Sequence, residues 1–202
     1  MRALSALLTL LWVSAVSAEP FPAFYDVTGV AEGDVLNIRQ DPSAASPVLG
    51  ALAPDAAFVE VVRREPDADW GLVRQGESMG WVSLRYMARH PGQDWQAPEA
   101  FTCIGTEPFW SLQVEGNVAS YSTPDAVSSS IVFDPFAVAP NNLTQFGAMG
   151  RRGPAEAPNL SLSVSRSLCS DGMSDILYGL SALLLVRDRE ESSALAGCCS
   201  LR

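Results

Sequence analysis

Short apolar segments separated by turn residues recur between residues 24 and 86. Residues 35–39 alternate between apolar and polar side chains, which places Leu36 and Ile38 on one face of a strand. Apolar segments at 58–62, 70–73 and 80–82 follow, with turn residues at 41–43, 53–55 and 75–77 between them. Short strands at this even spacing predict a small barrel or sandwich.

The chain beyond residue 100 also shows the period of β-strands. Residues 110–115 alternate strictly, Gly116-Asn117 is a two-residue hairpin signal, and residues 118–121 form the return strand. Further strands are predicted at 131–133, 160–165, 183–186 and 195–199. No segment beyond residue 18 keeps a helical period, and residues 135–153 are interpreted as a long irregular connection.

A polar stretch that contains prolines divides the two sets of strands. We interpret this stretch, residues 91–100, as a linker. The predicted fold is therefore all-β, with a small barrel over residues 24–90 and a second, antiparallel β domain over residues 101–202.

The first residues have the pattern of a secretory signal peptide. A charged start at Arg2 precedes an apolar stretch that ends in Val16-Ser17-Ala18, which suits cleavage after Ala18. A membrane anchor is the alternative, but it needs about 20 apolar residues and Glu19 arrives too soon. We therefore expect residues 1–18 to be removed, leaving a periplasmic or secreted protein with no membrane span.

The chain is acidic and contains no lysine. Its formal net charge is −10, and apart from one histidine every basic residue is arginine. An acidic surface without a basic cluster repels phosphate backbones, so nucleic acid is not an expected partner.

The four cysteines are predicted to form disulfides. All of them lie after residue 100, and they lack the paired spacing of zinc ligands. Successive strand residues point to opposite faces, so Cys198 and Cys199 should meet different partners. Of the three possible pairings our hypothesis joins Cys169 to Cys198 and Cys103 to Cys199. A bridge between Cys198 and Cys199 is the alternative, and it would strain the intervening peptide.

The order of motifs in the first domain resembles the bacterial SH3 domain. The motifs are Leu36-Asn37-Ile38-Arg39, Trp70-Gly71-Leu72-Val73, Gly80-Trp81-Val82 and Tyr86-Met87. The resemblance implies an SH3-type barrel of envelope proteins, with a role in binding cell wall or peptide and no catalysis. It makes Trp70, Trp81 and Tyr86 candidate groove aromatics, although Trp81 also suits a core position that closes the barrel.

Two motifs in the second domain resemble those of an uncharacterised bacterial envelope family. They are the segment from Cys103 to Trp110, which includes Glu107-Pro108-Phe109-Trp110, and the segment from Cys169 to Asp175. The resemblance implies membership of a family but no particular reaction, because the biochemistry of that family is not settled. Glu107, Trp110, Asp171 and Asp175 are the possible binding residues that these motifs carry.

The sequence lacks the groups that most catalytic mechanisms need. The only histidine is His90, next to the linker, no lysine is present, and no phosphate or dinucleotide loop occurs. The one catalytic mechanism that remains is acid–base chemistry by carboxylates, as in glycan hydrolysis, with Glu107, Asp171 and Asp175 as candidates. Each of these residues can also have a structural role, in a turn or at the start of a strand. We therefore expect no enzyme activity, no metal and no cofactor.

The sequence predicts a binding protein of the cell envelope. Peptidoglycan or a wall-associated protein is the expected partner of the SH3-type domain. A carboxylate-dependent glycan hydrolase in the second domain is the alternative. A third hypothesis is an inhibitor of a cationic wall-degrading enzyme. It follows from the acidic charge and from the resemblance, because members of that family often accompany domains similar to lysozyme inhibitors.

Overall fold

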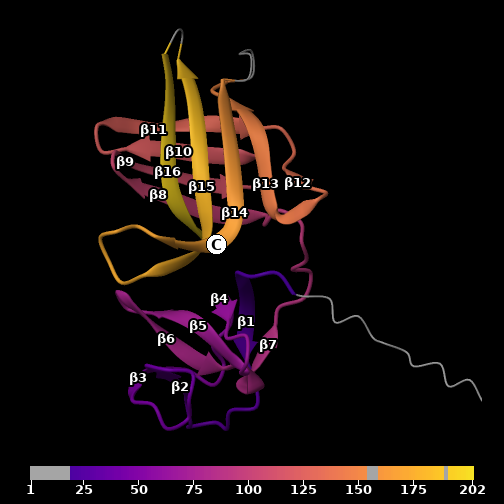
Figure 1. The fold of residues 1–202 in the computed structure, drawn as a ribbon, viewed down its shortest axis with the longest axis vertical. Coiled ribbons are helices and arrows are strands. Elements are labelled where there is room, and N and C mark those ends of the chain that lie inside the picture. The colour runs from indigo at the N-terminus through magenta and orange to yellow at the C-terminus, as the bar shows by residue number, and fades with distance from the viewer. Residues whose placement is uncertain (1–18, 154–158, 189–190) are drawn as a thin grey trace, which may run out of the picture.

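The protein consists of two antiparallel β-sheets, one above the other in Figure 1. The computed structural model describes residues 19–153, 159–188 and 191–202, so the predicted signal peptide lies outside the described residues. In these ranges the regular structure is all strand apart from one 3₁₀ turn, η1 (Leu84–Tyr86). The predicted all-β class is confirmed. No helix in the described ranges is long and apolar enough to span a membrane.

The N-terminal sheet has seven strands that curve around a small core. The strands are β1 (Ala23–Val27), β2 (Leu36–Arg39), β3 (Val48–Leu52), β4 (Val59–Arg64), β5 (Trp70–Gln75), β6 (Ser78–Ser83) and β7 (Met87–Arg89). Their order in the sheet is β3-β2-β6-β5-β4-β1-β7. The alternation expected for residues 35–39 is observed from Leu36 onward, because Leu36 and Ile38 are buried in this core while Asn37 is less buried.

The C-terminal sheet closes into an eight-stranded antiparallel barrel. Its strands are β8 (Ala100–Thr106), β9 (Phe109–Glu115), β10 (Val118–Thr123), β11 (Ala126–Phe133), β12 (Ala137–Ala139), β13 (Asn142–Arg151), β14 (Leu160–Ser170), β15 (Leu177–Asp188) and β16 (Glu191–Leu201). The order is β11-β10-β9-β8-β16-β15-β14-β13, and pairing of β11 with β13 closes the circle. Strand β12 extends the edge beside β13.

Long apolar side chains fill the inside of this barrel. The core includes Phe101, Leu112, Phe133, Leu162 and Leu184, each at most 1% exposed. The serines that alternate with Leu160, Leu162 and Val164 point away from that core, as the sequence pattern predicts. These strands form because each buries alternate side chains on one face of a closed sheet.

The expectation of an irregular connection over residues 135–153 was wrong. Strands β12 and β13 occupy most of this segment, and β13 pairs with β14 over six residues. The apolar alternation is weak because Gly150 takes an inward position, where the ring of Phe133 fills the space that a side chain would need. A glycine under an aromatic ring packs well but leaves no hydrophobic signal in the sequence.

The segment between the sheets is held by both of them. The side-chain amide of Gln93 donates to the carbonyl of Phe24 (2.8 Å) and accepts from its N–H (2.6 Å). Arg89 donates to the carbonyl of Gln93 (3.1 Å), and Arg166 of the barrel donates to that of Gln96 (2.7 Å). These bonds fix the path of the chain between the domains.

Candidate functional site

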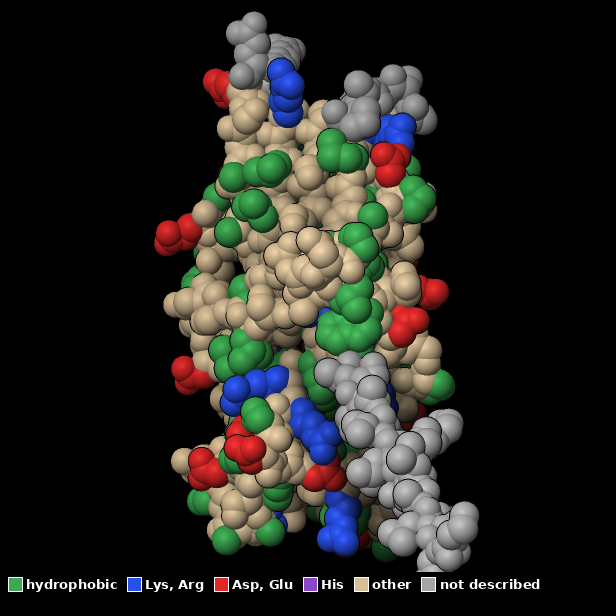
Figure 2. Space-filling model, turned by 45° about the vertical axis from the view of Figure 1, so that its right-hand side comes forward, with side chains coloured by type: hydrophobic (Ala, Val, Ile, Leu, Met, Phe, Trp, Pro, Cys, Tyr) green, Lys and Arg blue, Asp and Glu red, His purple; other side chains and the backbone are tan. Residues whose placement is uncertain are grey.

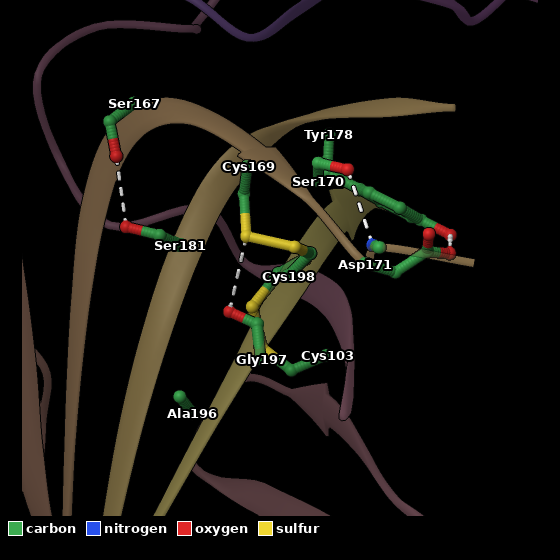
Figure 3. The surroundings of a disulfide bond; sticks show 12 residues. Cys103, Ser167, Cys169, Ser170, Asp171, Tyr178, Ser181, Ala196, Gly197 and Cys198 are labelled. Carbon is green, nitrogen blue, oxygen red and sulfur yellow. Dashed lines mark hydrogen bonds between the residues drawn. A yellow bond between two sulfur atoms is a disulfide. The ribbon is translucent and has the colours of Figure 1, made fainter. Parts of the chain in front are cut away.

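Two disulfides join the barrel strands as predicted. Cys103 of β8 bonds to Cys199 directly opposite it on β16, and both are fully buried in the core. Cys198 points to the other face of β16 and bonds to Cys169 of β14 (Figure 3). The pairing hypothesis is confirmed, for the stated reason that adjacent strand residues face opposite sides. Two disulfides are typical of proteins outside the cytoplasm.

The two disulfides bring the two sequence motifs of this domain together. Strand β16 carries both partner cysteines, so the β8–β9 turn and the β14–β15 turn lie at one end of the barrel. Contact between them is direct, since the hydroxyl of Thr106 donates to the backbone carbonyl of Asp171 (3.2 Å). The convergence that the sequence suggested is therefore present.

Asp171 is engaged in the turn that it begins. Its Oδ1 accepts the backbone N–H groups of Met173 (2.9 Å) and Ser174 (3.0 Å), and its Oδ2 accepts from the hydroxyls of Ser174 (3.1 Å) and Tyr178 (3.4 Å). The Met173 N–H is the main cause that lowers the pKa of this carboxyl, and the Ser174 and Tyr178 bonds add to it. This carboxylate is an acceptor that organises a loop.

The β14–β15 turn also docks the barrel onto the N-terminal domain. Ile176 and Tyr178 are buried in a cluster against which Met79 of β6 packs. Leu177 packs against a neighbouring cluster of the N-terminal domain that contains Trp81. Burial, together with the charge of Asp171, raises the pKa of Tyr178. The turn that carries the second motif is therefore part of the contact between the two domains.

The other candidate residues of the second domain do not form a shared cleft. Glu107 is exposed beside exposed Pro108 and Phe109, and Asp175 is exposed on the neighbouring turn. Trp110 is only 4% exposed, and its Nε1–H donates to the carbonyl of Ala196 (3.2 Å) inside the barrel. The Trp110 ring is thus part of the core and offers no surface to a ligand.

Replacing Asp171 by alanine should lower the thermal midpoint without removing any binding function of the N-terminal domain. The reason is that the N–H groups of Met173 and Ser174 lose their acceptor, which loosens the turn that docks the domains. Thermal unfolding followed by circular dichroism measures the effect. The matched control is Asp175→Ala, an exposed residue on the same turn, for which no change is expected; equal midpoints for the two variants would contradict this role.

Two of the three candidate aromatics line one groove of the N-terminal domain. Trp70 at the start of β5 and Tyr86 in η1 border a groove of about 930 Å³, together with exposed Val35. Tyr86 is 41% exposed, whereas Trp70 is partly covered by the cluster around Trp81. The groove has charges of both signs, from Asp34, Asp69, Arg39 and Arg85.

Trp81, the third candidate aromatic, does not line this groove. It is 8% exposed and packs with Val62 and Leu72 against Leu177 of the barrel, with the guanidinium of Arg63 over its ring at 5.1 Å. This cluster is separate from the core that the sheet encloses, so Trp81 joins the two domains and does not close the N-terminal core.

Sequence reasoning missed Glu60, a carboxyl group between the domains. It lies on β4, and its Oε1 accepts the backbone N–H of Leu201 on β16 (2.9 Å). Burial raises its pKa to about 7, although the Leu201 N–H and the charge of Arg74 act in the opposite direction. The only sequence signal was one acidic residue among the apolar residues at 58–62.

No group of three or more histidine, cysteine, aspartate or glutamate side chains is arranged for a metal ion within the described ranges. In comparisons with known proteins, no family model, no curated protein and no solved structure matches the chain. The groove and the junction between the domains are therefore the features of the molecule that bear on its function.

Proposed function

We propose that this chain is a non-catalytic binding protein of the bacterial cell envelope, exported by a signal peptide cleaved after Ala18. Its N-terminal, SH3-type domain contacts peptidoglycan or a wall-associated protein through the groove that Trp70 and Tyr86 border. The observation that supports the proposal most strongly is that these two rings, separated by 16 positions in the sequence, line the same open groove.

The chemistry of the groove suits a wall polymer or a peptide. Exposed aromatic rings offer apolar faces to sugar rings and peptide side chains, with a polar tip that hydrogen-bonds at the rim. Arginine and aspartate side chains around the rings match a partner with both carboxylates and amines. A groove of this size is typical of ligand sites.

The carboxylates of the second domain do not favour the hydrolase alternative. Glycan hydrolysis uses one carboxyl with a raised pKa close to one that remains ionised. At the turns where the motifs meet, the pKa of Asp171 is lowered and its oxygens already accept hydrogen bonds. Glu60, whose pKa is raised, belongs to the other domain and accepts from Leu201.

A pull-down of the two-domain chain on peptidoglycan sacculi tests the proposal. We expect retention that persists at high salt, and about a tenfold lower affinity for Tyr86→Ala, because a central aromatic residue often carries this much binding energy. Tyr86 is the better probe because its exposed ring contributes less packing than that of Trp70.

Phe109→Ala is the matched control, since Phe109 is 53% exposed on the other domain. It should bind like the unmodified chain. If the sacculi do not retain the chain, or if Tyr86→Ala and Phe109→Ala bind alike, the groove is not the contact surface. Retention that disappears at moderate salt would indicate charge attraction alone.

A further inference from the structure

A second cavity lies between the two domains, away from the aromatic groove. It has a volume of about 480 Å³ and is lined by the start of β1, the end of β7, the linker, β14 and the last two residues. Among its lining residues are three arginines, Arg89, Arg166 and Arg202, in a chain whose net charge is −10. In Figure 2 most of the visible arginine side chains lie on the lower part of the molecule, with acidic side chains among them.

Two of these arginines are held in place without a carboxylate partner. Arg89 donates to the carbonyls of Pro20 (2.8 Å) and Gln93 (3.1 Å) and lies over the ring of Tyr25. Among the described residues, neither Arg89 nor Arg166 forms an ion pair with a carboxylate; Arg202 pairs with Glu115. Carbonyl oxygens orient a guanidinium but leave its full positive charge uncompensated.

The charge of Arg166 is compensated only in part. Its Nη2 donates to the carbonyl of Gln96 (2.7 Å), and its guanidinium lies 5.8 Å from the ring centre of Phe146. Its Nε is buried and has no acceptor within the described part of the chain. Burial lowers its pKa and the positive charge of Arg89 lowers it further, whereas the negative charge of Asp94 acts in the opposite direction. The two arginines therefore act on each other across the cavity, and Asp94 offsets part of this effect. An anion in the cavity would relieve both effects.

The remaining lining residues indicate what kind of anion fits. Phe24, Pro98 and Leu201 provide apolar surface, whereas Asp94 and Glu99 add negative charge to the wall. Since Arg202 already pairs with Glu115, two unpaired arginines face two acidic side chains, and this wall suits a single negative charge better than a phosphate dianion. Guanidinium groups bind planar carboxylates well, and groups already oriented lose little entropy on binding.

We propose that the cavity between the domains binds a small ligand with one carboxylate and an apolar body, and that Arg89 and Arg166 recognise the carboxylate. This site is separate from the Trp70–Tyr86 groove and does not depend on wall binding there. Because Arg89 extends from the N-terminal domain and Arg166 from the barrel, the ligand would contact both domains at once.

Titration calorimetry on the two-domain chain tests the site with N-acetyl-alanyl-alanine, its C-terminal amide and inorganic phosphate as probes. We expect saturable binding of the free acid, at least tenfold weaker binding of the amide, and weaker binding of phosphate than of the acid. Saturable binding that weakens with added salt supports a charged contact. An amide or phosphate that binds as tightly as the acid, or no saturable binding of the acid, overturns the proposal.

Two variants with opposite expected effects on binding keep the proposal testable even if one of them does not fold. Arg166→Gln should weaken binding of the acid at least tenfold, and Asp94→Asn should strengthen it severalfold by removing a negative charge from the wall. Arg187→Gln, at the end of β15 opposite the domain junction, is the control and should bind unchanged. If Arg166→Gln fails to fold, unchanged or weaker binding by Asp94→Asn still overturns the proposal, as does full binding by a folded Arg166→Gln.

Discussion

Replacing Cys103 and Cys199 together by alanine is expected to lower the free energy of unfolding of the barrel by about 4.5 kcal/mol, from the entropy of the chain that this disulfide closes. The two residues are 96 positions apart, and the bridge ties β8 to β16, the pairing that joins the two ends of the domain. Both cysteines are fully buried, so alanine also leaves space in the core. Urea denaturation without reductant measures the loss.

The second disulfide provides the comparison. Cys169 and Cys198 close a shorter loop, of 29 positions, on the outside of the barrel. Alanine at both positions should cost about 3.5 kcal/mol, because the loop-closure entropy grows only slowly with length. A larger loss for this pair than for the buried pair would contradict the entropic explanation.

Replacing Glu60 by glutamine should remove a pH dependence of stability. The folded chain raises the pKa of this carboxyl from 4.5 to about 7, because burial between the domains favours its neutral form. The resulting stabilisation is complete below pH 4.5 and is lost as the pH rises through 7. At pH 8, Glu60→Gln should therefore be more stable than the unmodified chain by about 3 kcal/mol, the free energy that corresponds to this pKa difference.

Chemical denaturation at pH 5 and pH 8 separates the charge from the hydrogen bond. The glutamine carbonyl still accepts the N–H of Leu201, so the two proteins should differ by less than about 1 kcal/mol at pH 5. Glu32→Gln, at an exposed position, is the control and should follow the unmodified chain at both values. If Glu60→Gln loses stability between pH 5 and pH 8 as the unmodified chain does, Glu60 is not the titrating group.

The alternation of side chains determined much of the local structure. Leu160, Leu162 and Val164 predicted a strand with a buried face, and Gly116-Asn117 predicted a hairpin; both are observed. The adjacent Cys198 and Cys199 predicted two bridges on opposite faces of one strand. These inferences hold because the period of a strand is a property of a few neighbouring residues.

Closure of the barrel was decided by contacts that no local pattern contains. Strand β13 pairs with β11 where Gly150 lies under the ring of Phe133, and the glycine gives no apolar signal of its own. The role of Trp81 was likewise decided by the other domain, whose Leu177 packs against the cluster that Trp81 forms with Val62 and Leu72. Packing between distant segments determines which face of an apolar residue is covered.

The candidate sites also combine residues that the sequence indicated with an arrangement that only the tertiary structure determined. The motifs of the first domain made Trp70, Trp81 and Tyr86 candidate groove aromatics. Only the tertiary structure places Trp70 and Tyr86 along one groove and leaves Trp81 out of it. Glu60 and Arg166 look like ordinary polar residues of strands until the two domains meet around them. Their charges become informative only there, because burial and the neighbours brought by the fold determine the free energy of an ionised group.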